Sequence, residues 1–458
     1  MTARHARMSR RQMLKRTAGA VFPMIVPASV FGASAPSNRI TVAMIGMGRQ
    51  ARYANLTPFL VSEHTIVTAV CDVDAWRLDG AKAEVDKHYG NADCKAYRDW
   101  REVIARADVD AIMNSTPDHW HVPISLAAVR AGKHVSCEKP LTLSVAEGRV
   151  LADAVKKQGV VFRTDSECRS NAYMHRAAEL VVNGYIGRLK RAEVIVPTGD
   201  EAGGDATPAA VPEELDYDMW LGPAPMKPYA LDRVHPRKSL ERPGWMRCRD
   251  TCEGMITNWG THLLDVLQLA HGSERTGPVE VEGSGEYPAP GSGLWNVLLH
   301  FKARFRYADG VTVDYGTGDA TYVRFEGEDG WVQSTWFSGK DFQEGLTASA
   351  DGARESDALL HTKPKEGAPG AGDIRLPQRA DKEDFIYGIR TGKPVMADAE
   401  IGHRTCSMGQ IAHIAVQVGR KLPWNPDAER FAFTDPVRDD AQANALLERP
   451  IRGDWMKG

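Results

Sequence analysis

The sequence predicts an α/β fold whose N-terminal part is a doubly wound parallel sheet. Two observations support this fold class. Residues 40–46 (ITVAMIG) form an apolar, β-branched run that ends in glycine, which is typical of a buried parallel strand. A glycine-rich turn follows at once, and further apolar runs then alternate with helical stretches.

The turn after this run fits the pattern G-x-G-x-x-G/A, a signature of dinucleotide binding. Gly46 allows a tight turn, Gly48 lets the backbone approach a pyrophosphate, and Ala51 lets the next helix pack closely on the strand. Arg49 and Gln50 complete the turn, whose N–H groups are expected to face phosphate. Strand and turn together predict a Rossmann domain.

A second apolar run, residues 65–74 (TIVTAVCDVD), indicates which dinucleotide is bound. Asp72 lies at the end of the apolar part of this run, 24 residues after Gly48. A carboxylate there can accept hydrogen bonds from ribose hydroxyls and repels a 2′-phosphate, so we expect NAD rather than NADP. Arg77, five residues further on, complicates that preference.

Three more strand-like runs lead into loops, with helical stretches between them. Because they repeat the strand–loop–helix pattern, we assign residues 36–163 to the doubly wound domain and residues 164–458 to a second domain. The runs are residues 109–117 (VDAIMNSTP), 133–140 (KHVSCEKP) and 159–165 (GVVFRTD).

The composition excludes some partners. The chain has 458 residues, 43% hydrophobic and 26% charged, as expected for a soluble globular protein of two or three domains. The formal net charge is −3, and residues 1–35 hold six basic residues and no acidic one. The remainder therefore carries −9, which argues against nucleic acid or an anionic membrane as partner.

Residues 1–35 have the pattern of an export signal. The paired Arg10 and Arg11 precede an apolar stretch at residues 17–31 and small residues at 33–35. A charged start, a short apolar run and a small-residue exit predict a cleavable signal rather than a membrane span. The arginine pair resembles the twin-arginine signal, so we expect export to the periplasm. The alternative is a basic, disordered N-terminus.

We expect no metal centre. Cys248 and Cys252 have no second cysteine pair at metal-ligand spacing, and His119 and His121 have no third ligand nearby. The two cysteines form either a disulfide or, as we favour, two buried thiols.

Four longer motifs carry a family resemblance that covers essentially the whole chain after the leader. The chain resembles the Gfo/Idh/MocA oxidoreductases, which implies a second α+β domain with a large open, mostly antiparallel sheet. The family uses that sheet for oligomerisation, so we expect a homodimer or homotetramer. The motifs are residues 115–121 (STPDHWH), 137–148 (CEKPLTLSVAEG), 254–265 (GMITNWGTHLLD) and 399–431.

The second domain shows strand-like runs with period-two stretches and glycine turns, as the resemblance requires. They lie at residues 188–197, 294–316 and 321–336. Residues 347–379 are rich in Gly, Ala, Pro and charge with little periodicity, so we expect a surface excursion there.

The resemblance also implies which residues hold the cofactor and act on substrate. Lys139 is expected beside the nicotinamide, where it orients the reacting hydroxyl and its ammonium stabilises alkoxide charge. Thr116, Pro117, His121 and Glu138 are expected to join it at the cofactor.

Oxidation of an alcohol needs a base, and His262 is the leading candidate. On a helix, Asn258 and Asp265 share its face at i−4 and i+3. The family commonly has Asp at the place of Asn258, and Asn cannot stabilise an imidazolium by charge. Either Asp265 assists His262, or the proton goes elsewhere; the alternative reading is a packing histidine.

For the substrate, Trp120 offers a flat apolar face to a sugar ring, and Trp259, Arg169 and His403 are further candidates. We expect an exported NAD-dependent oxidoreductase that acts on a saccharide or cyclic polyol with a tightly held, internally recycled cofactor. One alternative is an NAD-dependent glycoside hydrolase that uses transient oxidation and elimination. The other is a sugar-binding protein that has lost catalysis.

Overall fold

The computed structural model describes residues 38–198, 200–338, 341–349, 374–434 and 437–456. The chain from Ile40 to Gly458 forms one compact unit. The predicted export signal, residues 1–35, lies outside the described residues. Within the described ranges, no helix combines the length and apolarity needed to cross a membrane.

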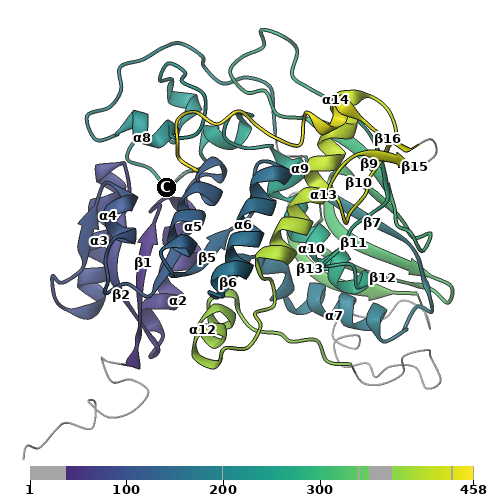
Figure 1. The fold of residues 1–458 in the computed structure, drawn as a ribbon, viewed down its shortest axis with the longest axis horizontal. Helices are drawn as coiled ribbons and strands as arrows, with labels where there is room; N and C mark the ends of the chain where they lie inside the picture. Colours follow the sequence, from purple (N-terminus) through teal and green to yellow (C-terminus); the bar gives the residue numbers. More distant parts are fainter. Residues whose placement is uncertain (1–37, 199, 339–340, 350–373, 435–436, 457–458) are drawn as a thin grey trace, which may run out of the picture. The chain divides into compact units, whose positions relative to one another are not determined.

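The first part of this unit is a six-stranded, fully parallel sheet (Figure 1) with the strand order β3-β2-β1-β4-β5-β6. The winding direction reverses between β1 and β4, which is where doubly wound sheets bind their ligands. The strands are β1 (Ile40–Ile45), β2 (Thr65–Cys71), β3 (Lys95–Tyr97), β4 (Ala111–Asn114), β5 (His134–Glu138) and β6 (Phe162–Asp165). The helices are α2 (Leu56–Val61), α3 (Ala75–Tyr89), α4 (Trp100–Ile104), α5 (His121–Arg130) and α6 (Val145–Gln158).

Local sequence explains where these helices begin and end. Asp74 caps α3, because its side chain accepts a hydrogen bond from the Arg77 N–H at 3.1 Å. Ser144 and Glu147 form a reciprocal capping box at the start of α6, and Gly159 ends that helix in a left-handed conformation. The strands between them are buried on both faces, as parallel strands covered by helices are.

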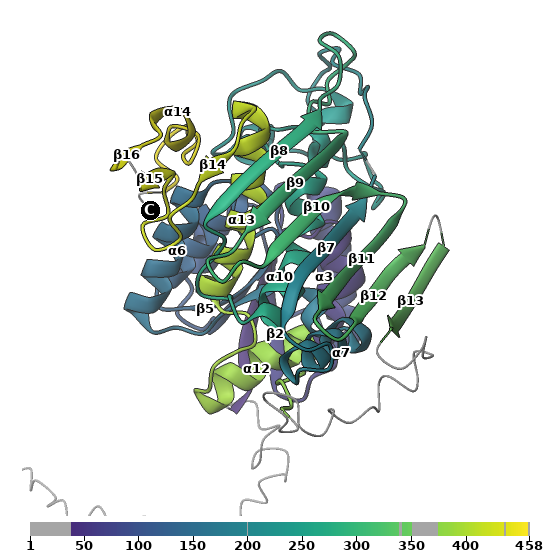
Figure 2. The ribbon, with the colours of Figure 1, turned by 90° about the vertical axis from the view of Figure 1, so that its right-hand side faces the viewer.

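The second part is an eight-stranded sheet with the order β13-β12-β11-β7-β10-β9-β8-β14 (Figure 2). All its pairs are antiparallel except β7 with β10. The predicted fold class is therefore confirmed. The strands are β7 (Leu189–Pro197), β8 (Glu280–Glu286), β9 (His300–Arg306), β10 (Thr312–Gly318), β11 (Ala320–Gly327), β12 (Trp331–Ser338), β13 (Asp341–Ala348) and β14 (Leu422–Pro423).

Helices cover one face of this sheet, and the other face points toward the viewer in Figure 2. In β9, Phe301, Ala303 and Phe305 are buried on the covered face, whereas the alternate residues are exposed. One apolar core joins these strands to the covering helices. The helices of this part are α7 (Ala172–Val182), α10 (Gly260–His271), α12 (Asp381–Thr391) and α13 (Ala399–Val418), and a small hairpin of β15 (Ala432–Thr434) and β16 (Val437–Asp439) precedes α14 (Ala441–Asn444).

The predicted boundaries differ in detail from these elements. The parallel sheet continues to Asp165, two residues past the boundary expected at 163. The expected excursion at residues 347–379 begins inside β13, and its central part, residues 350–373, lies outside the described residues. Its last residues are held by the main body, since the backbone N–H of Ile374 donates to the Asn183 side chain at 2.8 Å.

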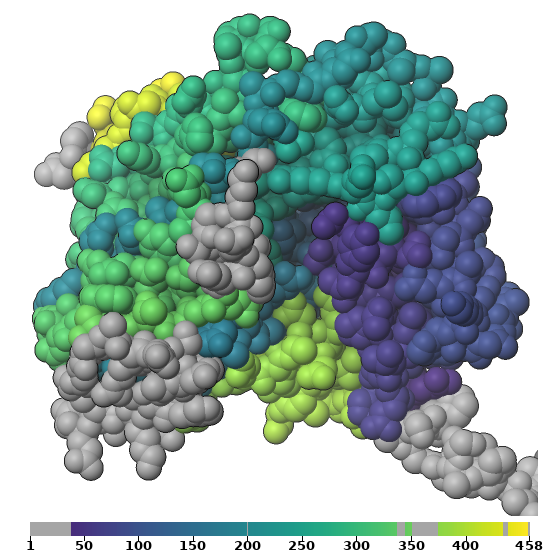
Figure 3. All heavy atoms as spheres, turned by 180° about the vertical axis from the view of Figure 1, so that it is seen from behind, coloured from purple at the N-terminus to yellow at the C-terminus, as the bar shows by residue number. Residues whose placement is uncertain are grey.

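A long segment between β7 and the short helix α9 (Met255–Asn258) crosses to the parallel sheet. We call residues 200–254, which include α8 (Tyr217–Leu221), the covering segment; it appears in teal in Figures 1 and 3. Its backbone is tied to the loop after β2: Asp216 N–H donates to the Val73 carbonyl at 3.0 Å, and Ala75 N–H to the Glu214 carbonyl at 2.9 Å. The segment thereby lies across the carboxyl end of the sheet.

Candidate functional site

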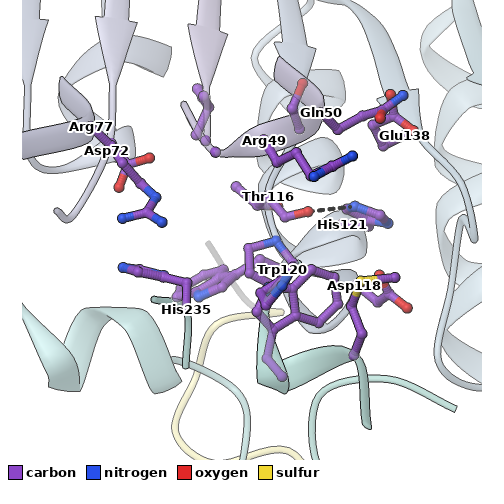
Figure 4. A pocket seen from close by; sticks show the side chains of 18 of the residues that line it. Arg49, Gln50, Asp72, Arg77, Thr116, Asp118, Trp120, His121, Glu138 and His235 are labelled. Atoms are coloured by element: carbon purple, nitrogen blue, oxygen red, sulfur yellow. Dashed lines mark hydrogen bonds between the residues drawn. The ribbon is translucent and has the colours of Figure 1, made fainter. Parts of the chain in front are cut away.

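A cavity of about 500 Å³ lies where the carboxyl end of the parallel sheet meets the covering segment (Figure 4). Residues of α9, α10 and β12 complete its wall. Most of the predicted site residues line it, although they come from distant parts of the chain. They are Gly46, Gly48, Arg49, Gln50, Asp72, Thr116, Pro117, Trp120, His121, Glu138, Lys139, Asn258, Trp259 and His262.

The structure explains the two glycines of the turn in different ways. Gly46 has a φ of +84°, and a Cβ there would lie 2.7 Å from the backbone of Ser115 and Thr116. A Cβ on Gly48 would meet nothing within 4 Å, so the backbone at this position is open to the cavity. Ala51 is fully buried and packs the following helical turn against the strand, as its place in the motif predicts.

Asp72 is fixed at the end of β2 by backbone donors. Its Oδ2 accepts from the Met47 N–H at 2.6 Å, and its Oδ1 accepts from the Asp74 N–H at 2.8 Å. Burial raises the pKa of Asp72, and these two hydrogen bonds act in the opposite direction. The carboxylate is thus held at the cavity wall, one strand away from the glycine turn.

Arg77, which complicated the choice of cofactor, is engaged elsewhere. Its guanidinium donates to Asp74 at 3.1 Å and to the Ser239 carbonyl at 2.7 Å. His235 reaches the same Asp74 carboxylate at 2.9 Å. The charge of Arg77 is therefore paired beside Asp72, although the side chain still lines the cavity.

His121 supports the loop after β4. Its ring nitrogens lie 2.7 Å from the Pro140 carbonyl and 2.9 Å from the Thr116 carbonyl. Burial lowers the pKa of His121 to about 4, so the ring is neutral at physiological pH and donates to one of the two carbonyls. It connects the Thr116 loop to the Lys139–Pro140 peptide on the neighbouring strand.

Lys139 and Asn258 meet in the cavity. The Lys139 Nζ donates to the Asn258 backbone carbonyl at 3.0 Å and to its side-chain Oδ1 at 3.3 Å. Lys139 follows β5, whereas Asn258 ends α9, so the contact joins the parallel sheet to the second part of the chain. The contact fixes the position of the Lys139 ammonium. The ammonium has three N–H donors, so it can still donate to a substrate oxygen.

His262 lies next to this pair in an aromatic setting. Its ring is 5.8 Å from the ring of Trp259 and 5.4 Å from that of Trp336. Its Nδ1 is buried and has no hydrogen-bond partner among the described residues. Burial, followed by the nearby positive charge of Lys139, lowers the pKa of His262 well below its usual range, so the ring is neutral.

Aromatic side chains line much of the remaining wall. Trp120 is almost completely buried, and its indole N–H donates to the Trp220 carbonyl at 3.0 Å. Trp336 of β12 also lines the wall, and Trp245 of the covering segment lies there too. The sequence analysis did not identify Trp220, Trp245 or Trp336 as residues of the site. No sequence motif marks a strand end or a loop that folds back onto a distant site.

Asp118 also lines the cavity, and the sequence analysis assigned it no role. It opens the short helical turn Asp118–Trp120 after β4 and is buried. Its Oδ2 has no hydrogen-bond partner among the described residues. Burial raises its pKa to about 7, while the Cys252 thiol and the charges of Lys139 and Arg449 act in the opposite direction.

Two predicted site residues, Asp265 and Arg169, form a structural pair outside the cavity. The Arg169 Nη2 donates to Asp265 Oδ1 at 2.7 Å, and Ser166 and Thr405 also donate to this carboxylate. The structure therefore places neither Asp265 nor Arg169 at the cavity that His262 lines. The helical spacing placed Asp265 near His262 in sequence, but its charge is satisfied by Arg169 instead.

His403 is also not at the cavity. It is fully buried in α13, and its Nε2 lies 2.7 Å from Glu429. Arg149 and Arg404 reach the same glutamate, so His403 belongs to a buried ion network that joins α6, α13 and the chain after α13. The structure therefore does not bring His403 to the cavity at which the sequence analysis expected it.

No group of three or more potential metal ligands occurs in the described ranges. Cys248 and Cys252 are both buried free thiols in this structure.

Two family models match this chain. Residues 40–166 match one described as oxidoreductase family, NAD-binding Rossmann fold, and residues 201–355 and 374–457 match one described as oxidoreductase family, C-terminal alpha/beta domain. The chain belongs to the Gfo/Idh/MocA oxidoreductase family. The resemblance carried by the sequence motifs is thereby confirmed over both parts.

Named relatives match parts of this Gfo/Idh/MocA protein. D-glucoside 3-dehydrogenase of Escherichia coli is 30% identical over 153 residues, which are 33% of this chain and 42% of the relative. A glycosyl hydrolase family 109 protein of a Shewanella species is 29% identical over 178 residues, 36% of this chain and 37% of the relative. The matches span less than half of either relative, so they do not establish a shared substrate.

A solved structure extends the likeness to nearly the whole fold. The aldose-aldose oxidoreductase from Caulobacter crescentus has a TM-score of 0.60 to this chain and 19% sequence identity. The match covers 84% of this chain and 99% of that one. At this identity the likeness shows a common Gfo/Idh/MocA fold.

The cavity fits a nicotinamide dinucleotide. The positive φ of Gly46 and the open space at Gly48 make a cradle for a diphosphate, and the fixed Asp72 carboxylate offers acceptors for ribose hydroxyls. Asp118, Lys139 and His262 line the same cavity. A nicotinamide dinucleotide held there would supply a hydride acceptor.

Proposed function

We propose that this protein is an NAD-dependent oxidoreductase that oxidises a hydroxyl of a saccharide or cyclic polyol. The observation that carries the proposal is the meeting of Lys139, Asn258 and His262 in one cavity with the glycine turn. These residues come from both parts of the fold, and they form a site only once the chain has folded.

The side chains divide the work on the reacting hydroxyl. Lys139 is held by Asn258, and its remaining N–H groups bind the substrate oxygen and stabilise negative charge that develops on it. The neutral His262 ring presents an acceptor nitrogen to the hydroxyl hydrogen. Together they orient the hydroxyl so that its carbon faces the cofactor.

The walls of the cavity favour a sugar or cyclic polyol. Trp259 and Trp336 present flat faces beside His262, and such faces stack on the C–H surface of a ring while a few polar groups bind its hydroxyls. The partial match to D-glucoside 3-dehydrogenase supports a substrate of this class.

NAD is the proposed cofactor, with NADP less favoured. The Asp72 carboxylate is fixed by two backbone N–H groups, so it cannot easily turn away from a 2′-phosphate. The neighbouring Arg77 is paired with Asp74 and offers no uncompensated positive charge.

We further propose that the cofactor stays bound throughout the cycle. The covering segment closes over the cavity and is tied to the far side by Arg77 and the Ser239 carbonyl at 2.7 Å, besides the backbone bonds at Val73 and Ala75. A retained cofactor must be returned to its starting state within each cycle, and a second carbonyl substrate can do so. Retention also suits export by the twin-arginine route, which carries folded proteins to the periplasm.

A second candidate function is an NAD-dependent glycoside hydrolase. The partial match to a glycosyl hydrolase family 109 protein favours it. Transient oxidation of a sugar carbon acidifies the neighbouring C–H, so that a glycosidic group can be eliminated; water addition and reduction then complete a net hydrolysis. The homodimer or homotetramer implied by the family resemblance stays a prediction.

A panel of substrates tests the proposal. Protein loaded with NAD is mixed with methyl glucosides, free aldoses, myo-inositol and aryl glycosides, and the absorbance of reduced nicotinamide and the release of aryl alcohol are followed. If a sugar reduces the bound NAD, the result supports the oxidoreductase. If an aryl glycoside releases its aryl alcohol without net reduction of NAD, the result supports the hydrolase. If neither occurs with any compound, the proposed function is wrong.

A separate experiment tests export. Residues 1–35 are fused to a reporter that is active only after folded export, and the paired Arg10 and Arg11 are replaced by lysines. We expect export of the unchanged fusion and retention of the variant; equal retention of both contradicts the assignment.

A further inference from the structure

We infer that Asp74, which is buried behind the wall of the cavity, is a positioning residue for the dinucleotide. It holds the covering segment against the loop after β2 and thereby slows the release of the bound nucleotide. The inference rests on the proposed cofactor, whose adenosine ribose is assigned to Asp72. It deepens that proposal because it assigns the closure of this end of the cavity to one carboxylate.

The Asp74 carboxylate binds groups from both sides of the cavity. Its Oδ2 accepts from the Arg77 guanidinium at 3.1 Å and lies 2.9 Å from the Nε2 of His235. A carboxylate can only accept, so the hydrogen of the second contact is on His235 Nε2. Arg77 belongs to α3, which follows β2, whereas His235 belongs to the covering segment. One carboxylate therefore joins the two, and we call Asp74, Arg77 and His235 the latch.

Arg77 extends the latch along the covering segment. Its guanidinium also donates to the backbone carbonyl of Ser239 at 2.7 Å and to that of Pro236 at 3.3 Å. The side chains of Arg77 and Asp74 are only 4% and 3% exposed. Because the pair is buried, loss of the carboxylate leaves the guanidinium buried without its anionic partner, which costs far more than loss of an exposed ion pair.

The backbone of Asp74 connects the latch to the cofactor site. The Asp74 N–H donates to Asp72 Oδ1 at 2.8 Å, and Asp72 Oδ2 accepts from the Met47 N–H of the glycine turn at 2.6 Å. Figure 4 shows Asp72, Arg77 and His235 gathered at one end of the pocket. A continuous chain of hydrogen bonds thus runs from the glycine turn through Asp72 and Asp74 to His235 in the covering segment.

The latch lies where it can control departure of the nucleotide. Asp72 lines the cavity from the sheet, and Trp220, His235 and Trp245 line it from the covering segment. A dinucleotide bound between these walls is covered at its adenosine end as long as His235 stays on Asp74. Differences in affinity between closely related complexes arise mostly from the dissociation rate. We therefore expect the latch to act on release.

Asp74→Asn tests the charge of the latch and leaves its other contacts in place. Asparagine caps a helix as well as aspartate does, and the backbone N–H to Asp72 is unchanged, so α3 should still begin at Ala75. Protein loaded with isotope-labelled NAD is mixed with an excess of unlabelled NAD, and the loss of label is followed. Asp74→Asn should release the label about 10-fold faster or more, because a buried charge pair is broken. An unchanged rate in the folded variant overturns the inference.

Variants of His235 test the link to the covering segment without touching the cap of α3. His235→Phe keeps a ring but has no donor, so release should be about 3- to 10-fold faster. His235→Gln keeps an N–H that can reach Asp74 and should recover most of the wild-type rate. In the double variant Asp74→Asn/His235→Phe, release should be hardly faster than in Asp74→Asn, since both changes break one contact. Failure of the glutamine variant to recover the rate, or effects that multiply, would overturn the inference even if Asp74→Asn does not fold.

Glu214→Gln is the matched control. It removes a carboxylate whose ion pair, with Arg237 at 2.9 Å, lies entirely within the covering segment. The backbone carbonyl of Glu214, which binds the Ala75 N–H, is retained. Release from this variant should match wild type. An acceleration equal to that of Asp74→Asn would mean that any lost charge loosens the segment, and it would contradict the role of Asp74.

Hydrogen–deuterium exchange of nucleotide-free protein gives a readout that needs no cofactor. Asp74→Asn should speed exchange in peptides of the covering segment and leave those of α13 unchanged, because only the latch is opened. If the protein binds no nucleotide but this local change occurs, the proposed cofactor fails while closure of the segment by Asp74 stands. If nucleotide binds and exchange in the covering segment is the same in both proteins, the inference is wrong.

Discussion

The Lys139 ammonium donates to both oxygens of Asn258, at 3.0 Å to the backbone carbonyl and at 3.3 Å to the side chain. This contact links the strand end after β5 to the helix that carries the second half of the site. Lys139 is thereby fixed in the cavity, even though it sits on a loop.

Replacement of Lys139 tests its role directly. Lys139→Ala should keep the fold and bound nucleotide but lose turnover by about 100- to 1000-fold, because the substrate oxygen loses its charged donor. Asn258→Ala should lose less, since the backbone carbonyl still holds the ammonium. Steady-state kinetics and nucleotide content of both variants check this, and unimpaired turnover in Lys139→Ala contradicts the mechanism.

The glycine turn offers a matched pair of variants. Gly46→Ala should unfold at lower temperature and fail to bind NAD, because the new Cβ meets backbone at 2.7 Å and φ is +84°. Gly48→Ala should fold normally, since its Cβ meets no protein atom within 4 Å, but should bind NAD more weakly. Thermal unfolding and calorimetric titration separate the two effects; equal unfolding temperatures for both variants argue against this account.

Asp72 is predicted to set the choice between NAD and NADP. Asp72→Ser should shift the ratio of the two dissociation constants toward NADP by about 10-fold or more, because repulsion of the 2′-phosphate is removed. The variant also loses an acceptor for the Met47 and Asp74 N–H groups, so its unfolding is measured alongside. If the folded variant shows an unchanged ratio of the two dissociation constants, Asp72 does not set the choice between NAD and NADP.

The Arg169–Asp265 pair is predicted to matter for stability rather than for catalysis. Arg169→Met leaves the Asp265 carboxylate buried without its charged partner, which should lower the free energy of unfolding by about 3–5 kcal/mol. The KM for substrate should not change in the protein that remains folded. Denaturant unfolding and kinetics check this, and a raised KM with unchanged stability would return Arg169 to the substrate site.

Asp118 also makes stability depend on pH. The pKa of Asp118 is about 7 in the folded state, which is above its pKa in the unfolded chain. Its contribution to the free energy of unfolding is therefore fully present below the unfolded-state pKa and is lost as pH rises through 7. Relative to wild type, Asp118→Asn should therefore gain stability by a few kcal/mol between pH 4 and pH 8. Denaturant unfolding of both proteins at several pH values measures the difference, and a constant difference contradicts the raised pKa.

Strands and the cofactor turn were the most predictable parts of the fold. β1, β2, β4, β5 and β6 each lie within one of the runs that the sequence analysis assigned to strands. The spacing from the G-x-G motif to Asp72 follows from the fold itself. β3 escaped prediction because it has only three residues and two of them are exposed. Such a short strand is defined by its pairing with β2 and not by its own pattern.

The site was predictable where motifs follow strand ends, and not where distant segments converge. Lys139, Asn258 and His262 lie in recognisable motifs. Trp336 and the covering segment reach the cavity only through the tertiary fold, so local sequence carries no sign of them. The pairing of Asp265 with Arg169 is likewise a long-range contact that helical spacing could not reveal.

The most direct test of the central claim uses protein purified without added cofactor. The protein is denatured, the released nucleotide is identified and quantified, and its redox state is compared before and after incubation with the sugar panel. The account predicts close to one NAD(H) per chain, with a redox state that changes when the correct sugar is added. Protein that carries no nucleotide and binds added NAD only weakly would contradict a retained cofactor and the closed cycle built on it.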